Sequence, residues 1–310
     1  MDKIIKNQQK PKNITINSDG QRIDNFLLKI IKGAPRSLIY KVIRDGQVRV
    51  NSKRVKPSYR LIAKDIVRVP PITPQIAERS KNDKFLENIK DYIIFENKDF
   101  LVINKPSGLA VHSGTNLEYD IISSLKKLKN NSDIAPVNRL DKNTSGCMLI
   151  SKNYQSARDL GNCFKSGNVK KTYLALLSGK LDKSEIIVDK PLKIDKQKKY
   201  GSVSIDSLGK SASSTFYLKK HFTSSTLVNV LIQTGRTHQI RVHASSINHP
   251  ICGDTKYGDK SINSAFRKIG LSRIFLHSTN LSFYFKKHYN FKAGLPDDLS
   301  ILIENLENEL

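Results

Sequence analysis

Cysteine is scarce in this chain of 310 residues, and the spacing of the three cysteines excludes the usual cysteine-built sites. Cys147, Cys163 and Cys252 lie far apart and form no Cys-x-x-Cys pair. The sequence therefore argues against a zinc ribbon, a disulfide framework and a dithiol redox site. We expect all three side chains to be small buried or half-buried apolar groups.

Long apolar runs are also missing. No stretch approaches the roughly 20 apolar residues that a membrane-spanning helix needs, and residues 1–6 lack the apolar segment of a secretory signal. The sequence thus predicts a soluble, cytoplasmic protein with no membrane partner.

Acidic residues are few compared with basic ones, with 28 Asp and Glu against 53 Lys and Arg and a net charge of +25. Such a surplus attracts a polyanion, most commonly nucleic acid. Lys, Ile and Asn are abundant throughout, which is also typical of an AT-rich coding bias, so the location of the charge is the better guide. Residues 19–71 hold thirteen Lys and Arg against four Asp, which shows that the charge is concentrated there.

The N-terminal part has the pattern of a small helix–helix–strand unit after a flexible basic tail over residues 1–17. Apolar residues between 23 and 30 recur at helical spacing and predict an amphipathic helix. A second, basic helix is expected over 37–44, and a half-buried strand over 47–51 follows the Asp45-Gly46 turn. Further short strands are expected around Val55 and over 59–61 and 66–69.

The same segments resemble the S4-type RNA-binding domain. The resemblance is carried by Arg22-Ile23-Asp24-Asn25-Phe26-Leu27, by the basic second helix and by Asp45-Gly46-Gln47-Val48-Arg49-Val50-Asn51. It implies that residues 18–71 contact structured RNA, mainly through its phosphates. The side chains expected on the RNA-binding face are Arg36, Lys41, Arg44, Arg49, Lys53 and Arg54.

The prolines at 70, 71 and 74 cannot continue a central strand, so we expect a linker over residues 72–90. A larger domain over 91–310 should then begin with strands at 92–95 and 100–104. Short strands and helices mix there without regular βαβ alternation, which favours an α+β fold. An amphipathic helix over 299–310 is expected to end the chain.

A carboxylate at Asp141 is the strongest candidate for catalysis. It lies in a polar loop, residues 138–146, between an apolar segment and the predicted strand 147–151. Arg139 and Lys142 flank it, and nearby cations favour the ionised form of a carboxylate. By spacing alone, an ordinary Asx turn in which Asp141 caps the backbone at 143 or 144 is the more common explanation.

Two other segments supply candidates for the same site. Tyr173 lies on the inner face of a predicted strand over 171–177, where it is either a core residue or the wall of a site. A second strand over 227–232 breaks at residues 233–235, and a helix is predicted to open at Arg236. On that helix Arg236 shares a face with Ile240, His243 and Ile247. An arginine on such a face requires an anion, and we expect that anion to be Asp141.

Metal binding is not expected. His238 and His243 are five residues apart rather than four, and no nearby Cys, Asp or Glu completes a set of ligands. Structural or RNA-contacting roles fit these histidines better.

Four ordered motifs of the larger domain are similar to those of RluA-type pseudouridine synthases. They are Ile103-Asn104-Lys105-Pro106-Ser107-Gly108, Arg139-Leu140-Asp141 with Thr144-Ser145-Gly146, Lys171-Thr172-Tyr173-Leu174-Ala175, and Thr234-Gly235-Arg236-Thr237-His238-Gln239-Ile240-Arg241-Val242-His243. The resemblance implies an α+β protein with a small S4-like domain and a catalytic domain built on a mixed, mainly antiparallel sheet.

The resemblance also implies an activity. Specific uridines of 23S ribosomal RNA, free or in a large-subunit precursor particle, would be isomerised to pseudouridine by a monomer without cofactor or metal. The N1–C1′ bond breaks, the base rotates and C5 joins C1′. Asp141 would act at C1′, as glycosidase carboxylates do, or assist removal of the C2′ proton, and the sequence leaves both routes open.

The resemblance assigns a role to each remaining candidate. Arg236 would pair with Asp141, and Tyr173 would stack on the target base and act as a base on it. Arg139 would occupy the space left when the uridine leaves its stack, and Ile240 would line the pocket.

One departure from the family pattern concerns Asn138, which stands where the family usually has His before Arg-Leu-Asp. Asn can donate and accept hydrogen bonds but carries no charge. We expect activity to survive because the family gives catalysis to the Asp. Two alternatives remain open: a non-catalytic RNA-binding or ribosome-assembly protein, and an RNA hydrolase that uses His238 and His243.

Overall fold

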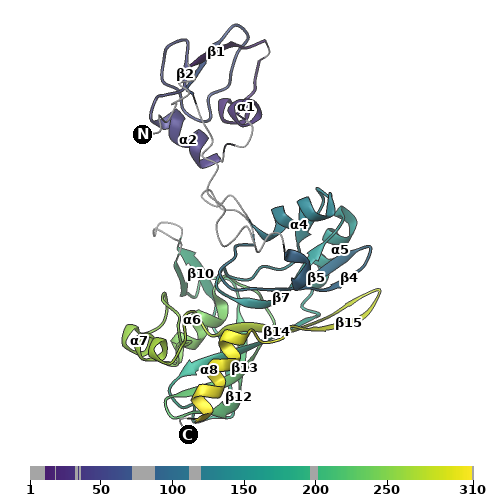
Figure 1. Cartoon of the computed structure of the whole chain (residues 1–310), viewed down its shortest axis with the longest axis vertical. Coiled ribbons are helices and arrows are strands. Elements are labelled where there is room, and N and C mark those ends of the chain that lie inside the picture. Colours follow the sequence, from purple (N-terminus) through teal and green to yellow (C-terminus); the bar gives the residue numbers. More distant parts are fainter. Residues whose placement is uncertain are drawn as a thin grey trace, which may run out of the picture. The chain divides into compact units, whose positions relative to one another are not determined.

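The computed structural model describes residues 11–17, 19–31, 34, 36–71, 88–111, 120–195 and 202–308, without the side chains of Arg36 and Ser37. The chain divides into two compact units, of which the first holds the described residues 11–71 and the second those from 88 onward (Figure 1). Among these residues no helix has the length and apolarity to cross a membrane.

The first unit packs two helices on a three-stranded antiparallel sheet of order β1-β3-β2. Its elements are β1 (Lys12–Thr15), α1 (Ile23–Ile30), α2 (Arg36–Arg44), β2 (Arg49–Val50) and β3 (Ile66–Val69). Ile23 and Leu27 of α1 and Ile39 and Ile43 of α2 are buried in one core. The predicted helices are thus confirmed, and their apolar spacing is what forms this core.

The predicted flexible tail over residues 1–17 is wrong from Lys12 onward, and residues 1–10 lie outside the described part. Strand β1 pairs with β3 along its whole length. Ile16, just beyond it, is 6% exposed in the core of the first unit. Ile14 and Ile16 therefore anchor this otherwise polar segment in the core of the first unit, beside the edge of β3. The strands predicted near Val55 and over 59–61 are absent from the described elements. In place of the strand over 59–61, the structure has a single isolated bridge between Arg22 and Arg60.

The predicted linker falls largely outside the described residues, which resume at 88. Ile89 is fully buried in the core of the second unit. The first described element of this unit is therefore the 3-10 helix η1 (Ile89–Tyr92).

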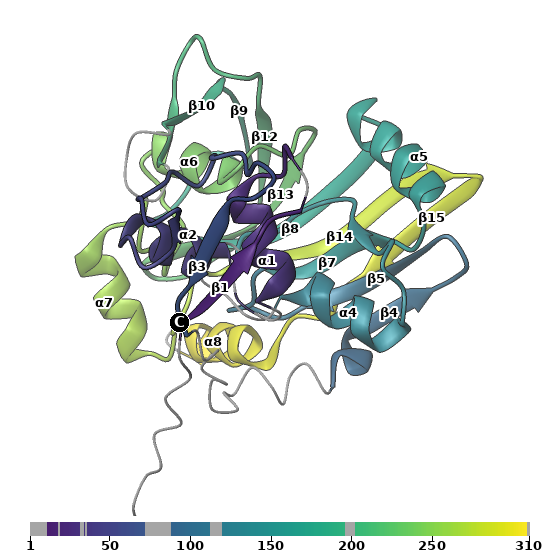
Figure 2. The same cartoon turned by 90° about the horizontal axis from the view of Figure 1, so that it is seen from above.

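The second unit is built on one ten-stranded sheet with the order β4-β5-β7-β14-β8-β13-β12-β9, to which β15 adds beside β14 and β6 beside β7 (Figure 2). Every pairing is antiparallel except that of β7 with β14, so the α+β fold with a mixed, mainly antiparallel sheet is confirmed. The strands are β4 (Ile93–Glu96), β5 (Phe100–Lys105), β6 (Ala135–Pro136), β7 (Ser145–Ser151), β8 (Val169–Ser178), β9 (Glu185–Asp189), β12 (Ser213–His221), β13 (Ser225–Ile232), β14 (Leu276–Phe285) and β15 (Lys287–Lys292), with a separate hairpin of β10 (Leu192–Asp195) and β11 (Ser202–Ile205).

Helices cover both faces of this sheet. Apolar residues of α4 (Ile121–Lys129) and α6 (Gln239–Ser246) join the core on the face that carries Tyr173 and Ala175. The opposite face is covered by α5 (Tyr154–Lys165) over one half and by α7 (Lys260–Lys268) and α8 (Asp297–Asn308) over the other. Because both faces are covered, most central strand residues are buried.

The two halves of the sheet meet at a short parallel junction, which we call the β7–β14 seam. It consists of two residue pairs, His277 with Ser145 and Ser278 with Gly146. Gly146 has a φ of +115°, and a Cβ atom there would collide with the backbone of Ser278. Only glycine fits at this position.

A buried histidine at the seam makes stability sensitive to acid. Nε2 of His277 must donate to the carbonyl of Ala293 (3.3 Å), so Nδ1 accepts from the Ser145 hydroxyl (2.9 Å) and the ring is neutral. Burial lowers the pKa of His277 to about 4. The unfolded chain therefore binds an extra proton between pH 6.5 and 4, and stability falls as the pH decreases through this window.

We expect the free energy of unfolding to drop by about 2–3 kcal/mol between pH 7 and 4.5 through His277. Urea unfolding of the wild type and His277→Gln at both pH values measures it, since the variant lacks this component. His288→Gln, at an exposed position on β15, is the control and should retain the wild-type pH dependence. An equal pH dependence in the wild type and His277→Gln would contradict the assignment.

Candidate active site

Asp141 lies in the loop before β7, and this loop is fastened by its main chain. The amide of Gly108 donates to the carbonyl of Lys142 (2.9 Å), and the Ser107 hydroxyl donates to the carbonyl of Asn143 (2.9 Å). The amide of Thr144 donates to the main-chain carbonyl of Asp141 (3.1 Å), not to its carboxylate. The Asx-turn explanation is therefore wrong, and the carboxylate is free to face other side chains.

A buried lysine is hydrogen-bonded to the main chain of the loop that carries Asp141. Lys105, at the end of β5, is 0% exposed, and its Nζ donates to the carbonyls of Pro106 (2.8 Å) and Lys142 (3.0 Å). Burial lowers the pKa of Lys105 to about 7, although the nearby Asp141 opposes this shift. A neutral amine still has two N–H groups, so both hydrogen bonds persist in either protonation state. Sequence reasoning quoted Lys105 only as part of a motif and gave it no role.

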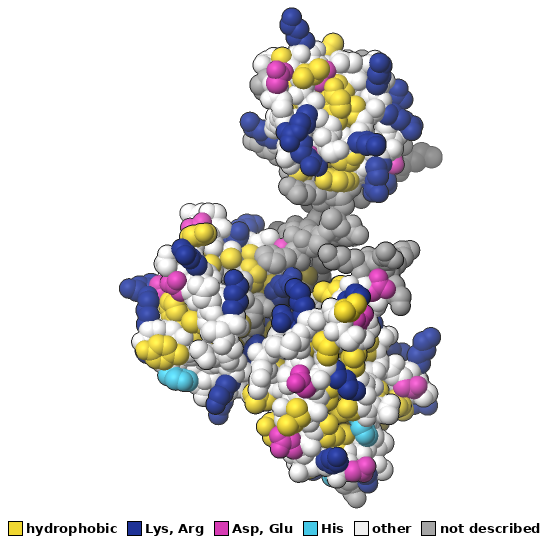
Figure 3. Space-filling view, turned by 180° about the vertical axis from the view of Figure 1, so that it is seen from behind, with side chains coloured by type: hydrophobic (Ala, Val, Ile, Leu, Met, Phe, Trp, Pro, Cys, Tyr) yellow, Lys and Arg dark blue, Asp and Glu magenta, His cyan; other side chains and the backbone are white. Residues whose placement is uncertain are grey.

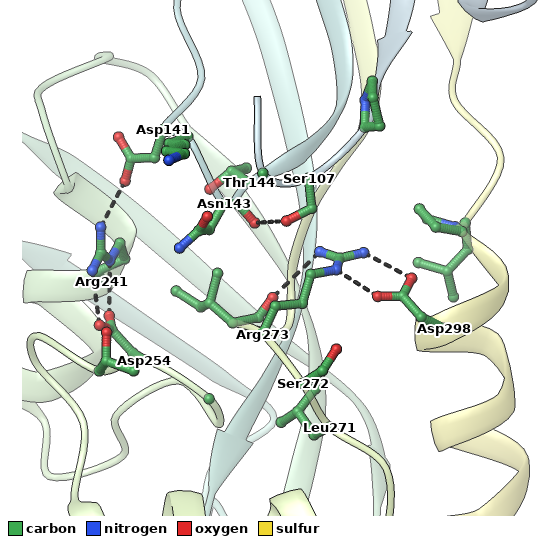
Figure 4. A pocket seen from close by; sticks show the side chains of 18 of the residues that line it. Ser107, Asp141, Asn143, Thr144, Arg241, Asp254, Leu271, Ser272, Arg273 and Asp298 are labelled. Atoms are coloured by element: carbon green, nitrogen blue, oxygen red, sulfur yellow. Dashed lines mark hydrogen bonds and ion pairs between the residues drawn. The ribbon is translucent and has the colours of Figure 1, made fainter. Parts of the chain in front are cut away.

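Arg241 holds the carboxylate of Asp141. Its Nη1 lies 3.0 Å from Oδ2 of Asp141, while Nε and Nη2 make two 2.8 Å hydrogen bonds to Asp254 (Figure 4). The side chain of Arg241 is 13% exposed and that of Asp254 is 0% exposed. Burial alone would lower the pKa of Arg241, but the hydrogen bond to Asp254 raises it above its ordinary value. The guanidinium is therefore permanently charged, and its geometry fixes one oxygen of Asp141.

The predicted pair of Asp141 with Arg236 is wrong. Helix α6 begins at Gln239 rather than at Arg236, because the Gln239 side chain accepts hydrogen bonds from the Arg236 amide (3.0 Å) and the Thr234 hydroxyl (2.7 Å) and so closes a turn. Arg236 is exposed, and its Nε donates to the carbonyl of Ser211 (3.0 Å). The helical face assumed from the sequence does not extend back to Arg236.

The two histidines of this segment differ in role. His243 is fully buried and lies between the Ser214 hydroxyl and the Lys190 carbonyl, both at 3.0 Å, so its role is structural. His238 precedes α6 and places Nε2 3.8 Å from Oδ2 of Asp141. Both polar contacts of the Asp141 carboxylate with described side chains therefore go to Oδ2, and Oδ1 makes no hydrogen bond or ion pair with the described residues.

All five residues predicted for the catalytic site meet in space. Arg139, Asp141, Tyr173, Arg236 and Ile240 line one small hollow of the second unit. This hollow adjoins a cavity of about 950 Å³, which Arg139, Asp141, Tyr173 and Arg236 also line. Asp141 borders a second cavity of about 940 Å³ as well, in which Arg273 pairs with Asp298 (Figure 4). The described residues include no group of His, Cys, Asp and Glu able to hold a metal ion.

Comparison with known proteins identifies this arrangement. The sequence model described as "RNA pseudouridylate synthase" matches residues 99–246, and that of the S4 domain matches residues 21–67. The "Ribosomal large subunit pseudouridine synthase C" of Haemophilus influenzae is 37% identical over 98% of this chain and 97% of its own length. The chain belongs to the RNA pseudouridylate synthase family. It is therefore an isomerase with an S4 domain in front of its catalytic unit.

Other comparisons agree with this pseudouridine synthase assignment. The protein of the same name from Buchnera aphidicola subsp. Baizongia pistaciae is 40% identical over 95% of this chain and 96% of its own. Among solved structures, "Human RNA Pseudouridylate Synthase Domain Containing 4" has a TM-score of 0.61 and 24% identity, covering 73% of this chain and 97% of that one. The likeness to this human protein concerns the fold of the catalytic unit.

In this synthase Tyr173 is a neutral wall of the hollow. Its side chain is 7% exposed in the core cluster that also holds Ile240. Burial raises the pKa of the Tyr173 phenol above its ordinary value. The hydroxyl is therefore protonated near neutral pH, which favours a stacking or hydrogen-bonding role over one as a phenolate base.

Asn138 has a defined partner. Its Oδ1 accepts a 2.7 Å hydrogen bond from the amide of Leu149 on β7. The side chain thus ties the start of the catalytic loop to a central strand, a task that requires an acceptor but no charge.

Cations line the larger cavity. Arg139, Lys165, Lys171 and Arg236 border it, against a single carboxylate, Asp141. Lys171 is only 6% exposed, and its Nζ contacts the carbonyl of Thr234 (3.3 Å) and lies 5.8 Å from the centre of the Phe164 ring. Burial, reinforced by Arg236, lowers the pKa of Lys171 to about 8. Among the described residues these four cations have no carboxylate partner, which suits a phosphodiester ligand.

Proposed function

We propose that this synthase converts specific uridines of 23S ribosomal RNA to pseudouridine, with Asp141 as the essential catalytic group. The observation that carries the proposal is the carboxylate of Asp141, which has Oδ2 held by Arg241, leaves Oδ1 without a hydrogen bond to the described residues, and borders a cation-lined cavity beside Tyr173. The names of the relatives from Haemophilus influenzae and Buchnera aphidicola support the large-subunit RNA as substrate.

The chemistry follows from these positions. A uridine that has left its stack enters the hollow against Tyr173 and Ile240. Oδ1 of Asp141 acts on the ribose, either at C1′, where it stabilises positive charge as the N1–C1′ bond breaks, or on the C2′ proton. The freed uracil rotates and C5 bonds to C1′. The proton on C5 is then released and N1, which lost its bond to C1′, takes up a proton, so the product is an isomer of the substrate. Arg241 holds and orients the carboxylate, while Arg139, at the exposed rim, is placed to fill the vacated stack.

The test of this function is release of tritium from 23S ribosomal RNA labelled at uridine C5. Release with the wild-type synthase and a pseudouridine in place of the labelled uridine are expected. Naked RNA and precursor particles serve as alternative substrates in the same assay. Release from neither would contradict the proposal.

The S4 domain supplies RNA affinity in this proposal. Lys and Arg side chains stand out over much of its face in Figure 3. Lys41, Arg44, Lys53 and Arg54 are exposed, and none has a carboxylate partner among the described residues. Arg49 is half-buried and donates to the carbonyls of Gly46 (3.3 Å) and Ser52 (3.1 Å), so part of its role is to hold the turn. The Arg36 side chain lies outside the described residues, and its predicted RNA contact stays a prediction.

A hollow of about 530 Å³ on the same unit gathers Lys53, Arg54 and Lys56 beside Tyr59. We expect the triple alanine variant of these three cations to bind 23S ribosomal RNA about 10- to 100-fold more weakly at physiological salt. The slope of log K against log salt should flatten by about 0.7–0.9 for each lost phosphate contact. The value of kcat at saturating RNA should not change.

Fluorescence anisotropy over a salt series measures this effect. Lys219→Ala, at an exposed position on β12 of the catalytic unit, is the matched control and should keep the wild-type slope. An unchanged slope in the triple variant would remove these residues from the RNA-binding face.

We also propose that the synthase works as a monomer in the cytoplasm. The predicted catalytic residues that line the hollow all come from one chain, and in bacteria, the source of the relatives from Haemophilus influenzae and Buchnera aphidicola, ribosomal RNA is made in the cytoplasm.

A further inference from the structure

We propose that His238 is a positioning residue for Asp141 and that a hydrogen-bond chain from β11 sets its tautomer. The chain runs from the amide of Val203 through the hydroxyl of Tyr257 to Nδ1 of His238, and it leaves the hydrogen of the ring on Nε2, which faces Asp141. This inference rests on the proposed role of Asp141.

The direction of the chain follows from its donors. The Val203 amide can only donate, and it lies 3.1 Å from the Tyr257 oxygen. That oxygen lies 2.7 Å from Nδ1 of His238. The hydroxyl oxygen accepts from Val203, which leaves its single hydrogen available for Nδ1 of His238. The neutral ring then carries its hydrogen on Nε2.

Electrostatics at the other end select the same tautomer. Nε2 of His238 lies 3.8 Å from Oδ2 of Asp141. A hydrogen on Nε2 points partial positive charge at this carboxylate, whereas the other tautomer would oppose it with a lone pair. Burial, together with Arg241 and Lys256 and against the opposing carboxylates of Asp141 and Asp254, lowers the pKa of His238. The neutral ring is therefore the resting form at neutral pH.

Tyr257 organises both groups that address Asp141. Its ring lies edge-on to His238, with centroids 5.4 Å apart, and the guanidinium of Arg241 lies 5.1 Å from its centroid. Its amide donates to Asp254, the buried partner of Arg241. One aromatic side chain thus fixes the spacing of the two donors that converge on Oδ2.

The backbone of His238 also restricts the ring. Its φ of +56° and ψ of +18° place it in the left-handed region at the N-cap of α6, where only a few residue types other than Gly are common, His and Asn among them. The 3.8 Å separation is longer than a hydrogen bond, and such contacts tighten when substrate binds. His238 then steadies Oδ2 and leaves Oδ1 directed at the ribose.

The kinetic test compares three variants. His238→Asn keeps tolerance of the left-handed backbone, but its amide is too short to reach Asp141, so kcat should fall about 10- to 100-fold with KM for RNA unchanged. His238→Gln offers a longer N–H donor and should recover part of this loss. Tyr257→Phe keeps the ring but removes the hydroxyl, so kcat should fall about 10-fold.

The double variant of His238→Asn and Tyr257→Phe shows whether the two side chains act through one hydrogen-bond chain or independently. Tyr257→Phe should lower kcat no further in a His238→Asn background, because the hydroxyl influences Asp141 only through the histidine. Fully additive losses would overturn the chain. A rise in KM with unchanged kcat would show that His238 contacts RNA and would overturn the positioning role. His221→Asn, on the far end of β12, is the control for loss of a histidine.

The tautomer itself is read without substrate from the ¹⁵N resonances of labelled histidine. We expect the wild-type His238 signal of a ring protonated at Nε2, and a mixture or reversal in Tyr257→Phe. A wild-type ring protonated at Nδ1 would overturn the proposal. Because this readout needs no turnover, a failure here is distinguishable from a failure of the proposed function, which tritium release by the wild type reports.

Discussion

Asp141→Asn is expected to abolish tritium release from 23S ribosomal RNA labelled at uridine C5, with a loss in kcat of about 10³-fold or more. The amide fills the same space, and its oxygen can still accept from Arg241 (3.0 Å in the wild type). What it loses is the charge and nucleophilicity of Oδ1, which either route at the ribose requires. Single-turnover assays with excess enzyme measure the chemical step separately from product release.

The control for this variant is RNA binding, which should stay within about twofold because the cations of the S4 domain and of the catalytic cavity are intact. Loss of affinity together with activity would point to misfolding or to a role of Asp141 in RNA placement. Residual activity close to the wild type would remove Asp141 from the reaction and would move the assignment of this chain toward an RNA-binding role.

Arg241→Met is expected to impair both stability and catalysis. It leaves Asp254 as a buried carboxylate with no cationic partner, which costs about 3–5 kcal/mol of unfolding free energy. It also frees Oδ2 of Asp141, so kcat should fall about 10²-fold in whatever fraction remains folded. Urea unfolding and single-turnover kinetics measure the two effects separately.

Arg236→Met is the matched comparison. This side chain is exposed, and with the described residues it makes one hydrogen bond, from Nε to a main-chain carbonyl, so the unfolding free energy should change by less than about 0.5 kcal/mol. An effect on KM is expected if the side chain contacts RNA phosphates. A larger stability loss for Arg236→Met than for Arg241→Met would contradict the pairing described for Asp141.

The sequence predicted the composition of the site better than its internal contacts. Ordered motifs placed Arg139, Asp141, Tyr173 and Ile240 together, and they line one hollow. The partner of Asp141 was missed because the start of α6 depends on Gln239, whose side chain closes the preceding turn. The spacing of apolar residues does not reveal such a side-chain contact. When the predicted first residue of the helix is wrong, the arginine predicted to face inward is wrong as well.

Other features were out of reach for a related reason. The role of Lys105 depends on the carbonyl of Lys142, in the loop that carries Asp141 and 37 residues further along the chain. That of His238 depends on the Tyr257 hydroxyl, 19 residues away. Neither separation leaves a periodic trace in the sequence. Strand β1 was missed because the segment is polar, and only pairing with β3 orders it. Helices α1 and α2, whose apolar faces supply their own signal, were predicted correctly.

The β7–β14 seam limits which sequence changes this fold can accept. Asp141 stands just before one side of the seam, whereas Tyr173 stands on β8, which pairs with the other side. The seam therefore joins the two sides of the site, and two residue pairs set the distance between them. A side chain added at Gly146 would collide with the backbone of Ser278 and push β7 and β14 apart. An insertion in the outer strands, β4 or β9, would leave the spacing of β7 and β14 unchanged. We therefore expect sequence changes to be tolerated in the outer strands of the sheet but not at the β7–β14 seam.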